Sequence, residues 1–269
     1  MIARGLSARR ACELLGLSRS SFAYKPAPKR NEELTLRLLE LAGDEPKLGY
    51  RMAWARLKGE FAPLNLKRVR RIWREQGLHL KRKKSRRIRG AKKPDVQARK
   101  PGDVWCMDFA HDSCANGTKI KCLAVVDECS RECVAMEVSR KIPAEKVIAA
   151  LEEAFAVHGV PKQIRCDNGP EFASWAMRLF LEGKGVSHVL IQPGSPWQNG
   201  FAESFIGTFR SECLDPELFF NLSDAQLRIS LWVKFYNEDR PHSSIGYLQP
   251  HAYKKRWHEL LSEKEETVV

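Results

Sequence analysis

The sequence predicts an α/β protein in which a mixed five-stranded sheet with flanking helices follows a basic helical region. From Gly102 onward, runs of β-branched and aromatic residues typical of strands alternate with amphipathic helical patterns. Charge divides the chain at the same place, because residues 1–100 contain 28 Lys and Arg against 9 Asp and Glu, whereas residues 101–269 contain 18 against 24. The basic part of this +13 chain is typical of a protein that binds a polyanion, and we expect that polyanion to be nucleic acid.

The first predicted helices lie within residues 7–24, where Gly16 would turn the chain and Ser18 would cap a second helix. This arrangement is typical of the back half of a helix-turn-helix, and two packed helices that contact no DNA groove are the alternative. Two more helices are predicted over Asn31–Ala42 and Gly49–Leu57 from the spacing of their apolar residues.

Asn65 is predicted to cap a helix that ends at Gly77 and has a strongly basic surface. A solvated basic face is the common explanation for such a pattern. Five cations in one short helix nevertheless favour contact with DNA phosphates. The residues predicted to make these contacts are Lys67, Arg68, Arg70, Arg71 and Arg74.

Residues 81–93 contain nine Lys and Arg and have no apolar periodicity. We expect an extended linker that lies along the phosphate backbone of nucleic acid, since it connects two folded parts. A disordered solubilising tail is the alternative. The linker residues predicted to contact DNA are Lys81, Arg82, Lys83, Lys84, Arg86 and Arg87.

Strands and helices alternate in the second part of the chain. Asn116 and Gly117 predict a hairpin turn between the first two strands, Pro143 is predicted to open a helix, and Gly159 is predicted to end it. This order is typical of a mixed sheet with helices on its faces. The predicted strands are 104–110, 120–128, 133–138, 160–167 and 186–193, and the predicted helices are 143–158, 174–183 and a long stretch from about residue 199.

Three acidic residues stand where their carboxylates can meet. Asp108 interrupts the first apolar strand, where an acid is costly unless it has a partner. Asp167 ends the fourth strand, and Glu203 begins the last helical stretch, with 35 residues between them. A turn at Asn168 and Gly169 would by itself explain Asp167. Together, however, the three acids offer the hard oxygen ligands that Mg²⁺ or Mn²⁺ prefers, and two such ions can stabilise both the attacking and the leaving oxygen of a phosphodiester.

Three motifs in this order, WCMDF, CDNGPEF and NGFAESFIGTFR, resemble those of a DD(35)E transposase with a retroviral-integrase-like core. LGYRMAWARL and NLKRVRRIWREQGL resemble the helical region ahead of that core in bacterial insertion sequences, and YNEDRPHSSIGYLQP resembles their C-terminal signature. These segments cover nearly the whole chain, and the specific likeness is to OrfB of the insertion-sequence-3 family. The resemblance implies an RNase H-like fold and a transposase that cleaves transposon ends and transfers strands.

The resemblance also implies roles for individual residues. Asp108 would bridge two metal ions, while Asp167 and Glu203 would each complete one site. The resembled family further implies a circular intermediate and fusion to an upstream product, OrfA, by frameshifting. We also expect at least a dimer on DNA, because two element ends must be held together. The residues predicted to contact DNA near the site are Gln198, Asn199 and Arg210.

Three further residues and the cysteines have structural interpretations. Glu171 is predicted as an acid at a helix N-terminus in preference to a metal ligand. Arg240 and His242 are predicted to anchor the C-terminal segment, with a direct DNA contact as the alternative. The eight cysteines form no C-x-x-C pair, and several lie in apolar runs, which favours reduced, buried thiols.

The predicted division is a helical DNA-binding region at 1–80, a basic linker at 81–99, a catalytic core at 100–220 and a helical extension at 221–269. No apolar run is long enough to span a bilayer and no secretory signal is evident, so we expect a cytoplasmic, nucleoid-associated protein without a membrane partner. Two other functions remain open. They are an RNase H-like nuclease that cuts without joining, and a non-catalytic DNA-binding protein derived from a transposase.

Overall fold

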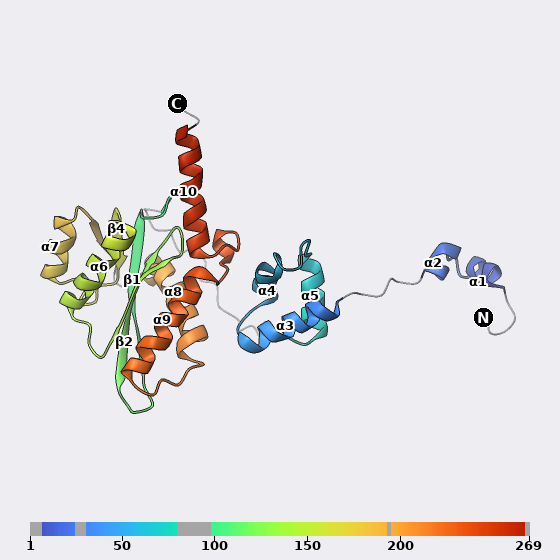
Figure 1. The fold of residues 1–269 in the computed structure, drawn as a ribbon, viewed down its shortest axis with the longest axis horizontal. Coiled ribbons are helices and arrows are strands. Elements are labelled where there is room, and N and C mark those ends of the chain that lie inside the picture. Colours follow the sequence, from blue (N-terminus) through green and yellow to red (C-terminus); the bar gives the residue numbers. More distant parts are fainter. Residues whose placement is uncertain (1–6, 25–30, 80–97, 193–194, 267–269) are drawn as a thin grey trace. The chain divides into compact units, whose positions relative to one another are not determined.

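The computed structural model describes residues 7–24, 31–79, 98–192 and 195–266, and its chain divides into two compact units, Met1–Glu40 and Leu41–Val269. In the first unit, α1 (Ala8–Leu14) and α2 (Arg19–Ala23) are short helices (Figure 1). Ser7 and Ser18 cap them by accepting backbone hydrogen bonds, and Gly16 turns the chain between them with a φ of +63°. These are the two helices predicted within residues 7–24. The third helix, α3 (Glu32–Asp44), crosses the division between the two units.

Two helices of the second unit carry the basic sequence ahead of the linker. The helices α4 (Tyr50–Leu57) and α5 (Leu66–Glu75) pack against each other, and Trp54 Nε1 donates a 2.9 Å hydrogen bond to the Leu64 carbonyl between them. Asn65 caps α5 as predicted, because its side chain accepts from the Lys67 amide at 2.8 Å. The apolar side of α5 is buried through Val69, Ile72 and Trp73.

A mixed sheet of five strands in the order β3-β2-β1-β4-β5 forms the centre of the second unit. β2 pairs antiparallel with both β1 and β3, whereas β4 pairs parallel with β1 and β5 pairs parallel with β4. Gly117 forms the predicted β1–β2 turn with a φ of +78°. The predicted five-stranded sheet is therefore confirmed. Its strands are β1 (Val104–Ser113), β2 (Lys119–Asp127), β3 (Cys133–Ser139), β4 (Gln163–Cys166) and β5 (Ser187–Leu190).

Helices cover both faces of the sheet (Figure 1). On one face, α6 (Ala144–His158) and α7 (Trp175–Gly183) pack on Trp105 and Met107 of β1. On the other face, α8 (Gly200–Phe209) and α9 (Leu222–Glu238) pack on Cys106 and Ala110. Because side chains alternate along a strand, Asp108 belongs to the α8–α9 face. The helix α9 thus shares a hydrophobic core with the strands, although it begins after the predicted core boundary at residue 220.

The C-terminal segment is held to the core by side-chain contacts. Arg240 forms a forked ion pair with Glu212, with its Nε and Nη2 each donating at 2.7 Å, and His242 is buried against the Tyr236 ring. Glu132 pairs with Lys254 at 2.8 Å. The predicted anchoring role of Arg240 and His242 is therefore confirmed. The remaining elements are η2 (Pro196–Asn199), η3 (Arg210–Leu214), η4 (Ser243–Ile245) and α10 (Pro250–Glu266).

The cysteines are free and mostly buried, as predicted. All eight cysteines are free, and seven of them are buried, Cys129 being the exception. None of the helices in the described part of the chain is long and apolar enough to cross a membrane.

Candidate active site

Asp108 lies in the middle of β1 and is partly buried. Its Oδ1 accepts a 2.7 Å hydrogen bond from the backbone amide of Phe109. Burial, and then the charges of Asp167 and Glu203, raise the pKa of Asp108 to about 6. The carboxylates of Asp167 and Glu203 are therefore close enough to disfavour the ionisation of Asp108, although the three residues come from three separate elements.

Asp167 follows directly after β4. The parallel register pairs Cys106 with Arg165, so the chain brings Asp167 alongside Asp108 just beyond the last paired residue. The backbone amide of Gly169 donates to Asp167 Oδ1 at 3.0 Å, and a Cβ atom at position 169 would lie only 3.1 Å from the same oxygen. A residue larger than glycine at this position would therefore push on the Asp167 carboxylate.

Glu203 lies in the first turn of α8 and is exposed. Its helix packs on β1 and β2, which fixes its start near Asp108. Asn199, just before this helix, is only 2% exposed, and its Nδ2 donates to the Met107 carbonyl at 3.2 Å. This contact attaches Asn199 to β1, and its predicted contact with DNA stays a prediction.

The three carboxylates approach one another without forming a closed cage. Among the residues that the structure describes, no three His, Cys, Asp or Glu side chains are grouped tightly enough to hold a metal ion. One oxygen of Asp167 is engaged by the Gly169 amide, and Glu203 is exposed to solvent. The donor set still suits a divalent cation, since carboxylate oxygens are the hard ligands that Mg²⁺ and Mn²⁺ prefer.

Glu171 has a different role from the predicted one. The helix α7 begins at Trp175 and is capped by Ser174, so Glu171 lies outside its first turn. Its carboxylate instead accepts a 2.5 Å hydrogen bond from Lys121 Nζ of β2. The helix N-terminal interpretation is therefore wrong, because a cation from a distant strand is the nearer partner.

Two predicted DNA-contacting residues flank the carboxylates. Arg210 is exposed and its Nη2 donates to the His111 carbonyl on β1 at 3.0 Å, which directs the guanidinium toward the strand of Asp108. Gln198 is partly exposed, and its Oε1 accepts from the Gln192 amide at 2.8 Å. Their contacts with DNA stay predictions.

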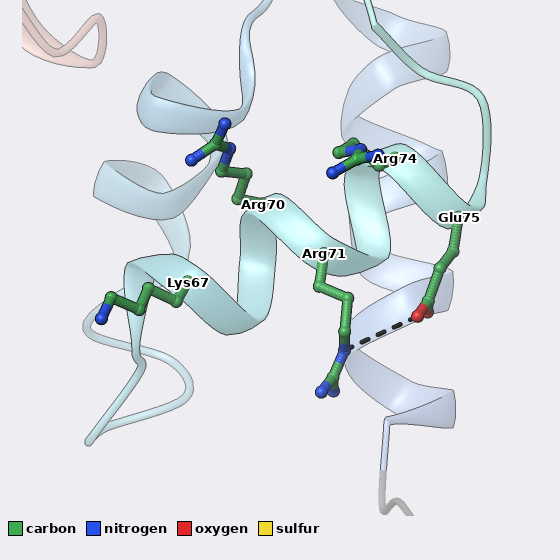
Figure 2. Close-up of a pocket in the computed structure, with 5 residues that line it drawn as sticks. All are labelled: Lys67, Arg70, Arg71, Arg74 and Glu75. Carbon is green, nitrogen blue, oxygen red and sulfur yellow. Dashed lines mark ion pairs between the residues drawn. The ribbon is translucent and has the colours of Figure 1, made fainter.

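Four cations of α5 share one helix face, because they occupy positions i, i+3, i+4 and i+7 of the helix. They are Lys67, Arg70, Arg71 and Arg74. Figure 2 shows the side chains of Arg70 and Arg74 on the same side of the helix and the pairing of Arg71 with Glu75, 3.6 Å apart. Arg68 is more buried than these four, and the predicted linker contacts from Lys81 to Arg87 lie outside the described residues. An open cleft of about 620 Å³ is lined by Lys67, Arg70, Arg71, Arg74 and Glu75.

Lys121 is the residue near this site that the sequence analysis missed. Its ammonium group lies over the ring of Phe109, the residue next to Asp108, as well as against Glu171. A lysine inside the apolar run of β2 was the available signal, since such a charge is costly without a partner. The partner itself is 50 residues further along the chain.

Comparisons with known proteins agree with this architecture. The integrase core domain family matches residues 98–196 and again 184–250, and the HTH-like domain family matches residues 29–86. The HTH-like match covers α3 to α5. The helix-turn-helix-like part therefore lies after residues 7–24, and the prediction that placed it within those residues is corrected. The matched region includes the basic face of α5.

Whole-chain relatives come from bacterial insertion elements. An uncharacterized 31.7 kDa protein of insertion element IS407 from Burkholderia multivorans is 42% identical over 92% of this chain and 90% of its own length. Transposase InsD of insertion element IS2 from Escherichia coli is 27% identical over 82% of this chain and 78% of its own. The HTLV-2 integrase catalytic core is 22% identical, with a TM-score of 0.44 over 54% of this chain and 92% of that chain. This chain therefore belongs to the integrase-core transposases of bacterial insertion elements, the family that its three acidic motifs predicted.

Proposed function

We propose that this transposase cleaves DNA at the ends of its insertion element and joins the freed 3′-hydroxyl to another phosphodiester, with Asp108, Asp167 and Glu203 as its catalytic carboxylates. The observation that supports the assignment is the raised pKa of Asp108, to which both of the other carboxylates contribute after burial. A partly buried carboxylate that two neighbouring acids repel is typical of a group arranged for a bound cation.

Divalent cations complete this proposal. Mg²⁺ or Mn²⁺, two per site when bound, would supply Lewis-acid stabilisation for the attacking and the leaving oxygen of the phosphodiester. Asp108 supplies a carboxylate from the rigid centre of the sheet, and Asp167 supplies one from a tight loop. Glu203 supplies the third from a helix packed on β1. None of these residues needs to form a covalent bond with DNA.

DNA contacts are proposed for both parts of the chain. The exposed cations of α5 and the linker cations, within residues 1–80 and 81–99, would contact phosphates by charge. Gln198 and Arg210 would contact DNA beside the catalytic core at 100–220, and α9 and α10 in the extension at 221–269 would brace that core. We further propose double-stranded terminal inverted repeats and target DNA as substrates. OrfA would be a fused partner, and the DNA-bound form would be at least dimeric.

The test is incubation of the purified chain with labelled terminal-repeat DNA and Mg²⁺, scored separately for cleavage and for joining. Asp108→Asn, Asp167→Asn and Glu203→Gln should each reduce both reactions to background while DNA binding is kept. A variant with near-normal activity removes that residue from the site. Cleavage without joining by the wild-type chain would favour the nuclease alternative, and binding without either reaction would favour the non-catalytic alternative.

A further inference from the structure

The ammonium group of Lys121 lies between an aromatic ring and a carboxylate. Its Nζ is 3.7 Å from the centroid of the Phe109 ring and 2.5 Å from Oε1 of Glu171. The side chains of Lys121 and Glu171 are 15% and 24% exposed, so both charges are largely removed from water, where cation–π and ion-pair contacts strengthen. The hydrogen bond from Lys121 accordingly lowers the pKa of Glu171, which favours the ionised carboxylate.

These contacts join the loop after Asp167 to the strand that carries Asp108. Phe109 follows Asp108 directly, and its ring stacks on Phe172 with centroids 4.6 Å apart and planes 6° apart. Phe172 follows Glu171 and is fully buried. The loop is therefore attached to the sheet at two successive residues, at Glu171 through Lys121 of β2 and at Phe172 through the stacked ring of Phe109 on β1.

The loop itself is short and internally bonded, so a displacement at Glu171 reaches Asp167. Gly169 is the central residue, since its amide donates to Asp167 Oδ1 at 3.0 Å and its carbonyl accepts from the Phe172 amide at 3.0 Å. At the other side, Asn168 Nδ2 donates to the Ile191 carbonyl at 2.6 Å. These hydrogen bonds restrain the loop between the Lys121–Glu171 ion pair and the Asp167 carboxylate.

We propose that Lys121 is a positioning residue that fixes the loop of residues 167–172 against β1 and thereby sets the Asp167 carboxylate beside Asp108. This inference rests on the proposed roles of Asp108 and Asp167 as metal ligands. The register pairs Lys121 with His111, two residues from Phe109, so Lys121 belongs to the sheet face opposite Asp108. It therefore acts through the loop and does not touch the reacting atoms.

Lys121→Met tests the inference because it keeps the length of the side chain and removes its charge. In the metal-free full-length chain, amide hydrogen exchange across residues 166–173 should become faster. Mn²⁺ binding measured by calorimetry should weaken by about 10–100-fold, the usual loss when a group that orients a metal ligand is removed. The Mg²⁺ concentration that gives half-maximal cleavage should rise by a similar factor, with DNA affinity unchanged.

Two matched variants separate this role from general loss of structure. Lys121→Arg keeps a cation that can stack on Phe109 and bond Glu171, so it should retain wild-type exchange and Mn²⁺ affinity. Lys119→Met removes an exposed lysine from the same strand and should change neither. If Lys121→Met fails to fold, Glu171→Gln replaces it with the same expected results.

Wild-type exchange in Lys121→Met would overturn the inference, and so would a loosened loop with unchanged Mn²⁺ affinity. Failure of the proposed function gives a different pattern. In that case Asp167→Asn would retain cleavage and Mn²⁺ binding, whatever the exchange of the loop in the Lys121 variants.

Discussion

Burial and two neighbouring carboxylates raise the pKa of Asp108 to about 6 from an ordinary value of 3.8, so its ionised form disfavours the metal-free fold. This cost is absent below pH of about 4, grows as the pH rises to about 6 and persists above it. Two pKa units correspond to at most about 3 kcal/mol, and partial exposure reduces that to roughly 1–2 kcal/mol.

Asp108→Asn should therefore stabilise the metal-free protein at pH 7.5 by roughly 1–2 kcal/mol, while abolishing catalysis. Urea unfolding in the presence of a chelator measures this change. The gain should disappear at pH 4, and Asp112→Asn on the same strand provides the control. A variant that is no more stable than the wild type at pH 7.5 would contradict the proposed repulsion between the carboxylates.

His242 affects the pH dependence of stability in the opposite direction to Asp108, because acid should destabilise the fold through this residue. Burial and the nearby Arg240 lower the pKa of His242 to about 3, so the folded protein keeps this ring neutral. The unfolded chain protonates it below pH of about 6.5, and its contribution to stability is lost as the pH falls from there toward 3. Each pH unit in this window costs about 1.4 kcal/mol.

His242→Phe keeps an aromatic ring against Tyr236 and removes the titrating group. Its free energy of unfolding should fall less steeply than that of the wild type between pH 6.5 and pH 4, by roughly 3 kcal/mol over the window. Urea titrations at three pH values provide the comparison. Equal slopes for the two proteins would show that His242 is not the acid-sensitive group.

At the scale of single elements, α5 combines a buried apolar side with a face of exposed cations. Arg70→Ala with Arg74→Ala should weaken binding to every DNA sequence alike and should flatten the dependence of affinity on salt by roughly 0.9 per lost phosphate contact. The measurement is binding at several salt concentrations. Arg178→Ala, which removes an exposed arginine from α7, should leave the slope unchanged, and an unchanged slope in the α5 variant would remove this helix from the interface.

Local signals in the sequence predicted the elements of the core. The Asn116–Gly117 turn, the Asn65 cap of α5 and the end of α6 at Gly159 each depend on a few neighbouring residues, and the structure reproduces all three. Contacts between distant segments could not be predicted in this way. Asn199 bonds a carbonyl 92 residues away and Lys121 pairs with an acid 50 residues away, because sheet register and helix packing bring them together.

At the scale of the whole molecule, the chain joins an HTH-like region to a catalytic core, and a transposase must find two element ends. We expect the isolated chain to bind DNA chiefly through phosphates, with modest preference for terminal repeats. Fusion to the OrfA product should raise the ratio of affinities for terminal-repeat over scrambled DNA by an order of magnitude or more. The reason is that a second DNA-binding domain would add base-edge contacts to the complex with the terminal repeat.

Both forms should be compared at one fixed salt concentration, with sedimentation of the DNA complexes as a second measurement. The fused form should sediment as at least a dimer on paired ends. Strong discrimination by the isolated chain that does not change on fusion would show that the region matched at residues 29–86 is already a complete reader of the element ends.

The buried cysteines can report local opening of the fold, because they become reactive only when they are exposed. Thiolates, not thiols, react with alkylating reagents. Burial raises the pKa of Cys122 and Cys213 to about 12 and that of Cys106 and Cys166 well above the ordinary range. Only Cys129 is partly accessible in the folded chain. Pulsed alkylation followed by mass spectrometry therefore measures how fast each buried cysteine becomes exposed. Cys106 and Cys166 closely precede Asp108 and Asp167, the proposed catalytic aspartates. Labelling of these two thiols therefore reports transient opening of β1 and β4 without any introduced probe.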